Sequence, residues 1–284
     1  MQDKEFWLSI QTDAHIESRE YCRTFSMLSI PSSDLVSERL RIEGYAPFRR
    51  LDWGGLIARC NQIISRLYTL NVPVVFAFLY DEFWELFVKM RPAILQAFGG
   101  EYYMLPQFWA WYVDPSKGAA GWPPHRDSGK ASLFADGKPK SLSVWLALSR
   151  ATPENGCMYI VPANRDLTYN TDKEGEYNGF RYVDARALPA EPGDFFIWNQ
   201  AVMHWGSQST PFAEGPRLST SMEFIKKGEK PLRADLALIH PKSVLSFKNR
   251  LYLCSELFLQ YKHMHKREGI FLDFAQQVVA QNKP

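Results

Sequence analysis

The spacing of apolar residues changes twice along the chain and divides it into three zones. Residues 32–98 carry apolar positions at helical spacing, and the predicted helices are SSDLVSERLRIEGY, LIARCNQIISRLYTL and DEFWELFVKMRPAILQAF. The first begins with serine and aspartate, which favour helix N-termini, and the third ends at Gly99-Gly100, a common stop signal. We therefore predict a helical N-terminal support over this zone.

From residue 102 to residue 226 the apolar spacing is typical of β-strands. Short runs such as QFWAWYV, SLSVWLAL, CMYIVPA, DFFIWNQ and LSTSMEFI are separated by turns that contain glycine or proline. Several short strands at this spacing predict a sandwich or barrel of the jelly-roll kind. In residues 227–284 the apolar residues again have helical spacing, so helices are predicted there. The expected fold is mainly β with flanking helices.

Composition supports one sizeable folded unit. The 284 residues contain no internal repeat, low-complexity tract or Gly/Ser-rich linker, so a single domain over 1–284 is expected. Apolar residues make up 46% of the chain and there are nine tryptophans, enough to bury a large core.

Charge and cysteine content exclude several classes of protein. The formal net charge is only +2 with acidic and basic residues interleaved, which gives no basic surface for nucleic acid or an anionic membrane. The four cysteines lie far apart, which favours a reduced, cytoplasmic protein. The N-terminus lacks the apolar core of a signal peptide, and the apolar runs are too short to span a bilayer. We also expect a monomer or a homodimer.

A candidate metal site begins at the segment His125-Arg126-Asp127. In an extended segment, residues two apart point to one face with Cα atoms roughly 6.5–7 Å apart, so His125 and Asp127 would converge. His204, after the predicted strand FFIWN, could add the third member of a two-histidine, one-carboxylate set. Such a set holds iron(II) in non-haem oxygenases and leaves coordination positions open. By itself, the tripeptide is a common chance match.

A carboxylate-binding pair follows the metal motif. Arg217 and Ser219 would share one face of a strand, and a guanidinium beside a hydroxyl suits a carboxylate. 2-Oxoglutarate has such a distal carboxylate, while its keto acid end could chelate the iron and leave one position for dioxygen. Each residue alone could have a packing role. Their joint order and spacing predict iron(II), 2-oxoglutarate and dioxygen as cofactors.

The residues around these motifs resemble the phytanoyl-CoA dioxygenase family, which includes the bacterial ectoine hydroxylases. The resemblance begins at Gly44 and is clearest from residue 107 to residue 224; its further motifs are SLSVWLALSRATPENGCMYIVPAN, AEPGDFFIWN and His-x-Gly-Ser. It implies a double-stranded β-helix (a cupin-like jelly roll), iron and 2-oxoglutarate. The family's usual Pro-Gly-Ser-His is replaced by Pro162-Ala163-Asn164-Arg165, so contacts of the following loop are not carried over.

Further pocket residues follow from strand alternation and from the resemblance. In SLSVWLAL the aliphatic positions are expected to meet the helices, which leaves Ser143 and Trp145 on the interior face. The resemblance also favours Ser143 and Gln107 near 2-oxoglutarate. A dry aromatic pocket suits oxidation chemistry because it excludes water. The candidate substrate contacts are Trp109, Trp145, Trp205 and Arg126.

Residues 163–190, rich in Asn, Tyr, Asp and Lys, are predicted to be an insertion over the mouth of the site. Such loops often govern specificity and become ordered when a ligand binds. We expect weak order in this segment without a ligand.

The predicted reaction is hydroxylation of an unactivated carbon of a small metabolite or natural product. Halogenases of this fold have a small residue at the position of Asp127, so its carboxylate disfavours halogenation. Desaturation, cyclisation and epimerisation share the same hydrogen abstraction and stay open. A jelly-roll binding module with a vestigial metal site is an alternative of another class. A cupin-type metal enzyme without a keto acid would leave Arg217 and Ser219 unexplained.

Overall fold

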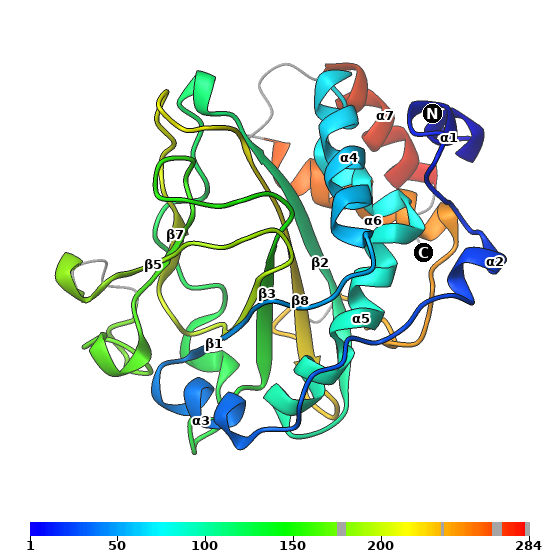
Figure 1. The fold of residues 1–284 in the computed structure, drawn as a ribbon. Coiled ribbons are helices and arrows are strands. Elements are labelled where there is room, and N and C mark those ends of the chain that lie inside the picture. The colour runs from blue at the N-terminus through cyan, green and yellow to red at the C-terminus, as the bar shows by residue number, and fades with distance from the viewer. Residues whose placement is uncertain (175–179, 234–235, 263–268, 282–284) are drawn as a thin grey trace.

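Two antiparallel sheets form the centre of the computed structural model, which describes residues 1–174, 180–233, 236–262 and 269–281 (Figure 1). The larger sheet has the order β1-β6-β3-β8-β2, with the bounds Tyr45–Phe48, Phe195–Asn199, Ser141–Ala147, Arg217–Lys226 and Tyr102–Val113. The smaller sheet has the order β5-β4-β7, with the bounds Arg186–Leu188, Met158–Ile160 and His204–Gly206. With the helices beside them, the sheets form the predicted jelly roll.

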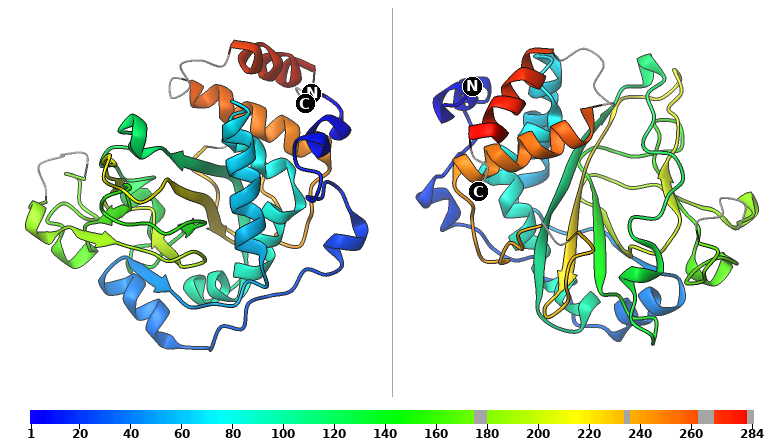
Figure 2. Two further views of the ribbon diagram at one scale, coloured as in Figure 1. Left: turned by 45° about the horizontal axis from the view of Figure 1, so that its top comes forward. Right: turned by 180° about the vertical axis from the view of Figure 1, so that it is seen from behind.

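Helices cover one side of the larger sheet, and the smaller sheet lies on the other side (Figure 2). The α-helices are α1 (Lys4–Ile10), α2 (Arg19–Cys22), α3 (Asp34–Ile42), α4 (Leu56–Thr69), α5 (Asp81–Phe98), α6 (Phe247–Gln260) and α7 (Gly269–Gln281). Short 3-10 helices are η1 (Val74–Leu79), η2 (Pro115–Lys117), η3 (Gly129–Ser132), η4 (Ala163–Arg165) and η5 (Tyr182–Asp184). Within the described ranges, no helix has both the length and the apolarity needed to cross a lipid bilayer.

Strand β3 separates two hydrophobic cores, as its alternation predicts. All seven of its residues are buried. Leu142, Val144 and Leu146 belong to the core that also contains the helices, whereas Trp145 and Ala147 belong to the core between the sheets. Because successive side chains of a strand point to opposite faces, the residues between the sheets are the ones that can face a site.

Two boundaries differ from the prediction. Tyr45–Phe48, inside the zone predicted as helical, is strand β1 and pairs with β6. The chain turns into this strand at Gly44, whose φ of +78° and close neighbour Val202 suit glycine. At the other end, the described residues between 227 and 246 form no helix, and Ile239 pairs with Met104 instead. The predicted stop at Gly99 is confirmed.

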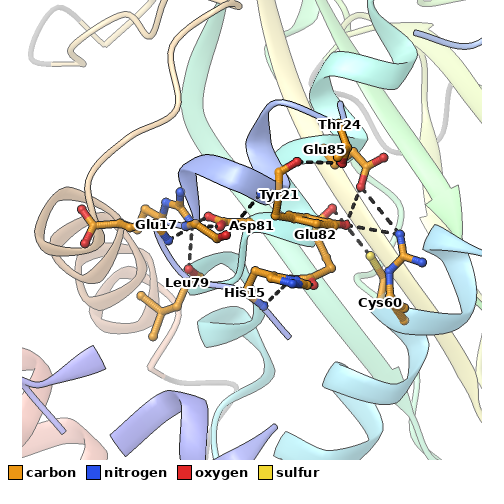
Figure 3. Close-up of polar contacts among 12 residues, drawn as sticks. His15, Glu17, Tyr21, Thr24, Cys60, Leu79, Asp81, Glu82 and Glu85 are labelled. Atoms are coloured by element: carbon orange, nitrogen blue, oxygen red, sulfur yellow. Dashed lines mark hydrogen bonds and ion pairs between the residues drawn. The ribbon is translucent and has the colours of Figure 1, made fainter. Parts of the chain in front are cut away.

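A buried carboxylate at the start of α5 ties three distant segments together (Figure 3). Asp81 accepts hydrogen bonds from the backbone N–H groups of Glu17 and Ser18, at 3.1 and 2.8 Å. It also forms an ion pair of 2.7 Å with Arg250 of α6, and both side chains are fully buried. The N-terminal segment and α6 are therefore held to α5 through one carboxylate.

Two more carboxylates of α5 face the same N-terminal segment (Figure 3). Glu82 lies 2.8 Å from the ring nitrogen of His15, and Glu85 accepts a hydrogen bond of 2.5 Å from the hydroxyl of Tyr21. Arg59 of α4 donates to the same hydroxyl. Burial raises the pKa of Glu82, although the contact with His15 opposes that shift. The segment thus packs on α5 through polar contacts.

We expect Asp81→Ala to lower the free energy of unfolding by about 3–5 kcal/mol, because the charge of Arg250 would stay buried without its partner. Urea denaturation followed by circular dichroism measures this change. As a control, Asp81→Ala combined with Arg250→Met should cost less than the sum of the two single changes, because no unpaired charge remains. A loss below about 1 kcal/mol for Asp81→Ala would contradict this account.

Candidate metal centre

His125, Asp127 and His204 converge on one cavity. The Nε2 atoms of both histidines lie 3.5 Å from Oδ1 of Asp127, and the two imidazole centroids are 4.3 Å apart. One donor atom from each residue fits within 4.8 Å of the other two. Donor atoms held at right angles at roughly 2.0–2.2 Å from an ion would be about 3 Å apart. The three side chains therefore have nearly the spacing of ligands around one metal ion.

The backbone brings the two histidines together. His125 and His204 exchange N–H···O bonds of 3.0 and 2.9 Å, an isolated antiparallel bridge. Their Nδ1 atoms lie 2.7 Å from the carbonyl oxygen of Pro123 and 3.2 Å from that of Val202. A carbonyl oxygen only accepts, so each Nδ1 carries the hydrogen and each Nε2 has a free lone pair. This is the tautomer in which Nε2 binds a metal.

The second oxygen of Asp127 is held by hydrogen bonds. Oδ2 accepts from the hydroxyl of Ser143 at 2.7 Å and from the indole N–H of Trp198 at 3.2 Å. These two donors leave Oδ1 directed at the histidines. Neighbours of this kind orient metal ligands in proteins.

Protonation of Asp127 and His204 fits metal binding, whereas the contact with Asp127 raises the pKa of His125 although burial opposes that shift. Burial would raise the pKa of Asp127, but the charges of the two histidines and its hydrogen bonds lower it below its usual value. Burial lowers the pKa of His204 to about 4, more than the carboxylate of Asp127 raises it. At neutral pH, Asp127 is therefore ionised and His204 is neutral, and these are the forms that coordinate metals.

Arg217, at the start of β8, lines the same cavity and is only 1% exposed. Its Nη1 donates to the hydroxyl of Ser219 at 2.7 Å. Among the described residues, Nε and Nη2 have no hydrogen-bond partner. Burial lowers the pKa of Arg217 to about 10, so the group stays charged at neutral pH. A buried guanidinium with unpartnered N–H groups suits a ligand carboxylate.

Two glycines make room beside this guanidinium. A Cβ added to Gly121 would lie 2.7 Å from Cα of Gly206 and 3.2 Å from Nη2 of Arg217. The two backbones can approach each other only because neither residue has a side chain. This close approach explains the glycine in the motif His204-x-Gly206.

The cavity has a volume of about 60 Å³ and walls that are mostly apolar. The predicted pocket residues that line it together with the metal ligands and Arg217 are Gln107, Trp109, Ser143 and Trp145. Ser143 donates to Asp127 and accepts a hydrogen bond from Gln200, so its hydroxyl has a positioning role toward the metal ligand. The predicted contacts of Ser143 and Gln107 with 2-oxoglutarate stay predictions.

Arg126, predicted to contact the substrate, lines a separate hollow beside His125 and Asp127 and not the cavity that contains His204 and Arg217. Its side chain forms an ion pair of 2.7 Å with Asp166, and a substrate contact stays a prediction. The same guanidinium donates to the hydroxyl of Thr168 and to the carbonyl oxygen of Ala201. These contacts hold Arg126 against the segment that follows η4.

Trp205, also predicted to contact the substrate, does not line the cavity that contains the metal ligands, and its substrate contact stays a prediction. It follows His204 in β7, so its ring points to the opposite face of the strand. There it stacks on Tyr159 and Phe180, with centroids 5.6 Å apart in both pairs. The residue lies outside the cavity that contains the metal ligands.

Part of the predicted lid, residues 175–179, lies outside the described residues. Before it, Glu174 accepts a hydrogen bond from the backbone N–H of Lys130, and Asp172 pairs with the side chain of Lys130. The insertion is thus attached to the loop that directly follows the metal motif. Weak order without a ligand stays a prediction.

Glu223 is a cavity residue that sequence reasoning missed. It lies on the same face of β8 as Arg217 and Ser219, and its register partner in β3 is Ser143. Burial, and then the negative charge of Asp127, raise its pKa to about 8. The alternation of LSTSMEFI could have found it, because Glu223 lies an even number of residues after Arg217 and Ser219 and so continues their face.

Comparisons with known proteins agree with this geometry. Residues 81–212 match the family model described as phytanoyl-CoA dioxygenase. The chain is 28% identical over 96 residues to the dioxygenase lolE1 of Epichloe uncinata; these residues are 33% of this chain and 35% of that protein. The match thus spans about a third of this relative's length.

Two crystal structures of enzymes from nogalamycin biosynthesis have the same fold. The epimerase SnoN, in complex with Fe3+, alpha ketoglutarate and nogalamycin RO, is 20% identical with a TM-score of 0.53, over 74% of this chain and 87% of that chain. The non-heme alpha ketoglutarate dependent carbocyclase SnoK is 14% identical with a TM-score of 0.54, over 73% of this chain and 87% of that chain.

Proposed function

We propose that this chain, whose residues 81–212 match the phytanoyl-CoA dioxygenase family model, is an iron(II)- and 2-oxoglutarate-dependent oxygenase that hydroxylates an unactivated carbon of a small molecule. One observation carries the proposal: the metal triad and a buried arginine with unpartnered N–H groups line one cavity. A divalent metal would bind to the triad, and a dicarboxylate that chelates this metal could also accept the free N–H groups of the arginine. A site for a metal alone would not account for the arginine.

The chain's own residues have distinct tasks in this proposal. His125, Asp127 and His204 would hold the iron, and Arg217 with Ser219 would hold the distal carboxylate of 2-oxoglutarate. When bound, iron(II) and 2-oxoglutarate supply the activation of dioxygen, in which the keto acid becomes succinate and carbon dioxide while a substrate C–H bond is oxidised. The largely apolar walls exclude water, which limits side reactions.

Epimerisation and ring closure are the second candidate reactions, because SnoN is named an epimerase and SnoK a carbocyclase. They begin with the same removal of hydrogen from the substrate and differ afterwards. We favour hydroxylation because it needs no group beyond the metal triad and the co-substrate anchor, whereas epimerisation also needs a hydrogen donor on the opposite side of the substrate carbon. Mass spectrometry of the product separates them: hydroxylation adds one oxygen atom, epimerisation leaves the mass unchanged and ring closure removes two hydrogens.

When iron(II) and 2-oxoglutarate are added together without oxygen, we expect a weak visible charge-transfer band. The reason is that the triad leaves coordination positions open for the keto acid. Titration by absorption spectroscopy measures the band. Succinate in place of 2-oxoglutarate is the control, because it has no keto group to chelate the iron. A folded protein that gives no band would instead be a jelly-roll binding module with a vestigial metal site.

Residues 1–284 are proposed to act as one domain. Buried residues of α1, α5, α7 and the larger sheet belong to one continuous hydrophobic core. A cytoplasmic location, the absence of nucleic-acid partners and a monomeric or homodimeric state stay predictions.

A further inference from the structure

Four aromatic side chains form a closed ring of contacts in the wall of the metal cavity. The ring centroids of Trp109 lie 6.3 Å from those of Trp111 and 5.0 Å from those of Tyr261. Trp122 contacts the same two partners, at 5.2 and 5.0 Å. Trp122 also lies 5.5 Å from His125, so the ring of contacts adjoins the metal ligands.

These rings are turned at steep angles to one another. Three of the four contacts are edge to face, with interplanar angles of 65°, 75° and 81°. The face of an aromatic ring is its electron-rich side, and all four residues line the cavity. A wall of this kind attracts a cation within about 6 Å of the ring centroids.

The carboxylate of Glu223 lines the same cavity, and one of its oxygens accepts a hydrogen bond. Its Oε2 accepts a hydrogen bond of 2.9 Å from the side-chain amide of Gln200. This hydrogen bond uses Oε2 and leaves Oε1 available to a ligand, and the residue is only partly exposed. A carboxylate removed from water is strongly disfavoured unless a cation or a donor compensates it. A ligand in the cavity can supply that compensation.

Strand β8 places Glu223 at the opposite end of the cavity from the co-substrate anchor. Arg217 and Glu223 are six residues apart on one face, which is about 20 Å along an extended strand. Glu223, Asp127 and Tyr261 also line a second hollow of about 260 Å³. Glu223 thus lies between the metal ligands and a larger space into which a substrate can extend.

We propose that this end of the cavity binds a substrate through a cationic nitrogen, with Glu223 as the counter-charge and the four aromatic rings as the wall. The inference rests on the proposed function and names its substrate class as amines that are protonated at neutral pH. Burial and the charge of Asp127 favour the protonated form of Glu223 in the empty cavity. A bound cation favours the ionised form, with the proton released to solvent, whereas a neutral alcohol of the same shape does not. An anionic substrate would be disfavoured by the electron-rich ring faces and by any ionised Glu223.

Three probes of similar shape test the proposal: cyclohexylammonium, cyclohexanol and cyclohexanecarboxylate. Their binding is measured by isothermal titration calorimetry on protein loaded with iron(II) and 2-oxoglutarate, without oxygen. We expect cyclohexylammonium to bind about tenfold more tightly than the alcohol, and the carboxylate to bind more weakly than either. Equal affinities of the ammonium and the alcohol, or a preference for the carboxylate, would overturn the proposal.

Matched variants assign the preference to the named residues. Glu223→Gln keeps the size of the side chain and removes its charge, so the preference for the ammonium should fall to about threefold or less. Glu256→Gln makes the same change on the exposed part of α6 and should keep the full preference. Trp111→Leu removes one aromatic face and should weaken binding of the ammonium more than that of the alcohol. If Glu223→Gln does not fold, the affinities of Trp111→Leu for the ammonium and the alcohol test the proposal instead.

The two proposals can fail separately. Repeating the titrations without iron(II) and 2-oxoglutarate measures amine binding independently of turnover. A charge-transfer band without preference for the ammonium would overturn the inference and keep the proposed function. Preference for the ammonium without the band would overturn the proposed function and keep the amine site.

Discussion

His204→Ala will abolish iron-dependent succinate formation and lower the affinity for iron(II) by more than about 100-fold. His204 supplies one of three donors, is 4% exposed and has its lone pair at Nε2 directed toward Oδ1 of Asp127. Loss of a residue that only orients a metal ligand costs about 10–100-fold in affinity or activity, and loss of a ligand itself exceeds that. Asp127→Ala should have the same effect, since it removes the only carboxylate of the triad.

The measurement combines metal analysis after dialysis with an assay of succinate. His240→Ala is the matched control, because this histidine is exposed and its ring nitrogen only accepts a hydrogen bond from the backbone of Lys242. That variant should keep the iron and the activity of the unchanged protein. An unaltered iron content together with full succinate production in His204→Ala would rule out the assigned triad.

Arg217→Met will raise the KM for 2-oxoglutarate on the order of 100-fold or more, and it will leave the affinity for iron(II) nearly unchanged. Hydrogen bonds to charged groups contribute about 1.5–3 kcal/mol each, and the unpartnered Nε and Nη2 would make two of them to the co-substrate. Arg217→Lys keeps the charge but not the planar fork, so its KM should lie between those of the other two proteins. Initial rates at varied 2-oxoglutarate concentration measure the three values.

The stability of Arg217→Met provides an independent check. Without a ligand, the buried guanidinium of Arg217 has two N–H groups without a partner in the part of the chain that the structure describes. Methionine is uncharged, so it removes the cost of burying that charge. The thermal midpoint of the variant should therefore be equal to or above that of the unchanged protein, and 2-oxoglutarate should no longer raise it. A variant with an unchanged KM and unchanged stabilisation by 2-oxoglutarate would exclude Arg217 as the anchor.

Local periodicity was sufficient to predict the elements that carry the site. Residues two apart on a strand share a face, which is how His125 and Asp127, and then Arg217 and Ser219, could be placed together before any coordinates. The same rule placed Trp145 between the sheets and the aliphatic residues of β3 against the helices. The end of helix α5 could be predicted because its apolar spacing stops at a pair of glycines.

Pairing between distant strands was not predictable from the same patterns. Strand β1 has only four residues and contains Pro47, so nothing in its composition distinguishes it from a loop. Arg126 has the chemistry of a substrate contact, but its partner Asp166 comes from a later loop whose position depends on the whole fold. Glu223, in contrast, is marked by the alternation of β8, since it shares the face of Arg217 and Ser219.

The backbone bridge between His125 and His204 separates metal binding from folding. In zinc fingers the ligands come together only when the metal binds, so removing the metal unfolds the domain. Here the two histidines exchange N–H···O bonds on their own, and the hydroxyl of Ser143 and the indole of Trp198 hold the carboxylate. The conformational entropy of ordering the ligands is thus lost when the chain folds. Chelation should therefore give an intact, reloadable apoprotein, and one divalent ion can be exchanged for another without refolding.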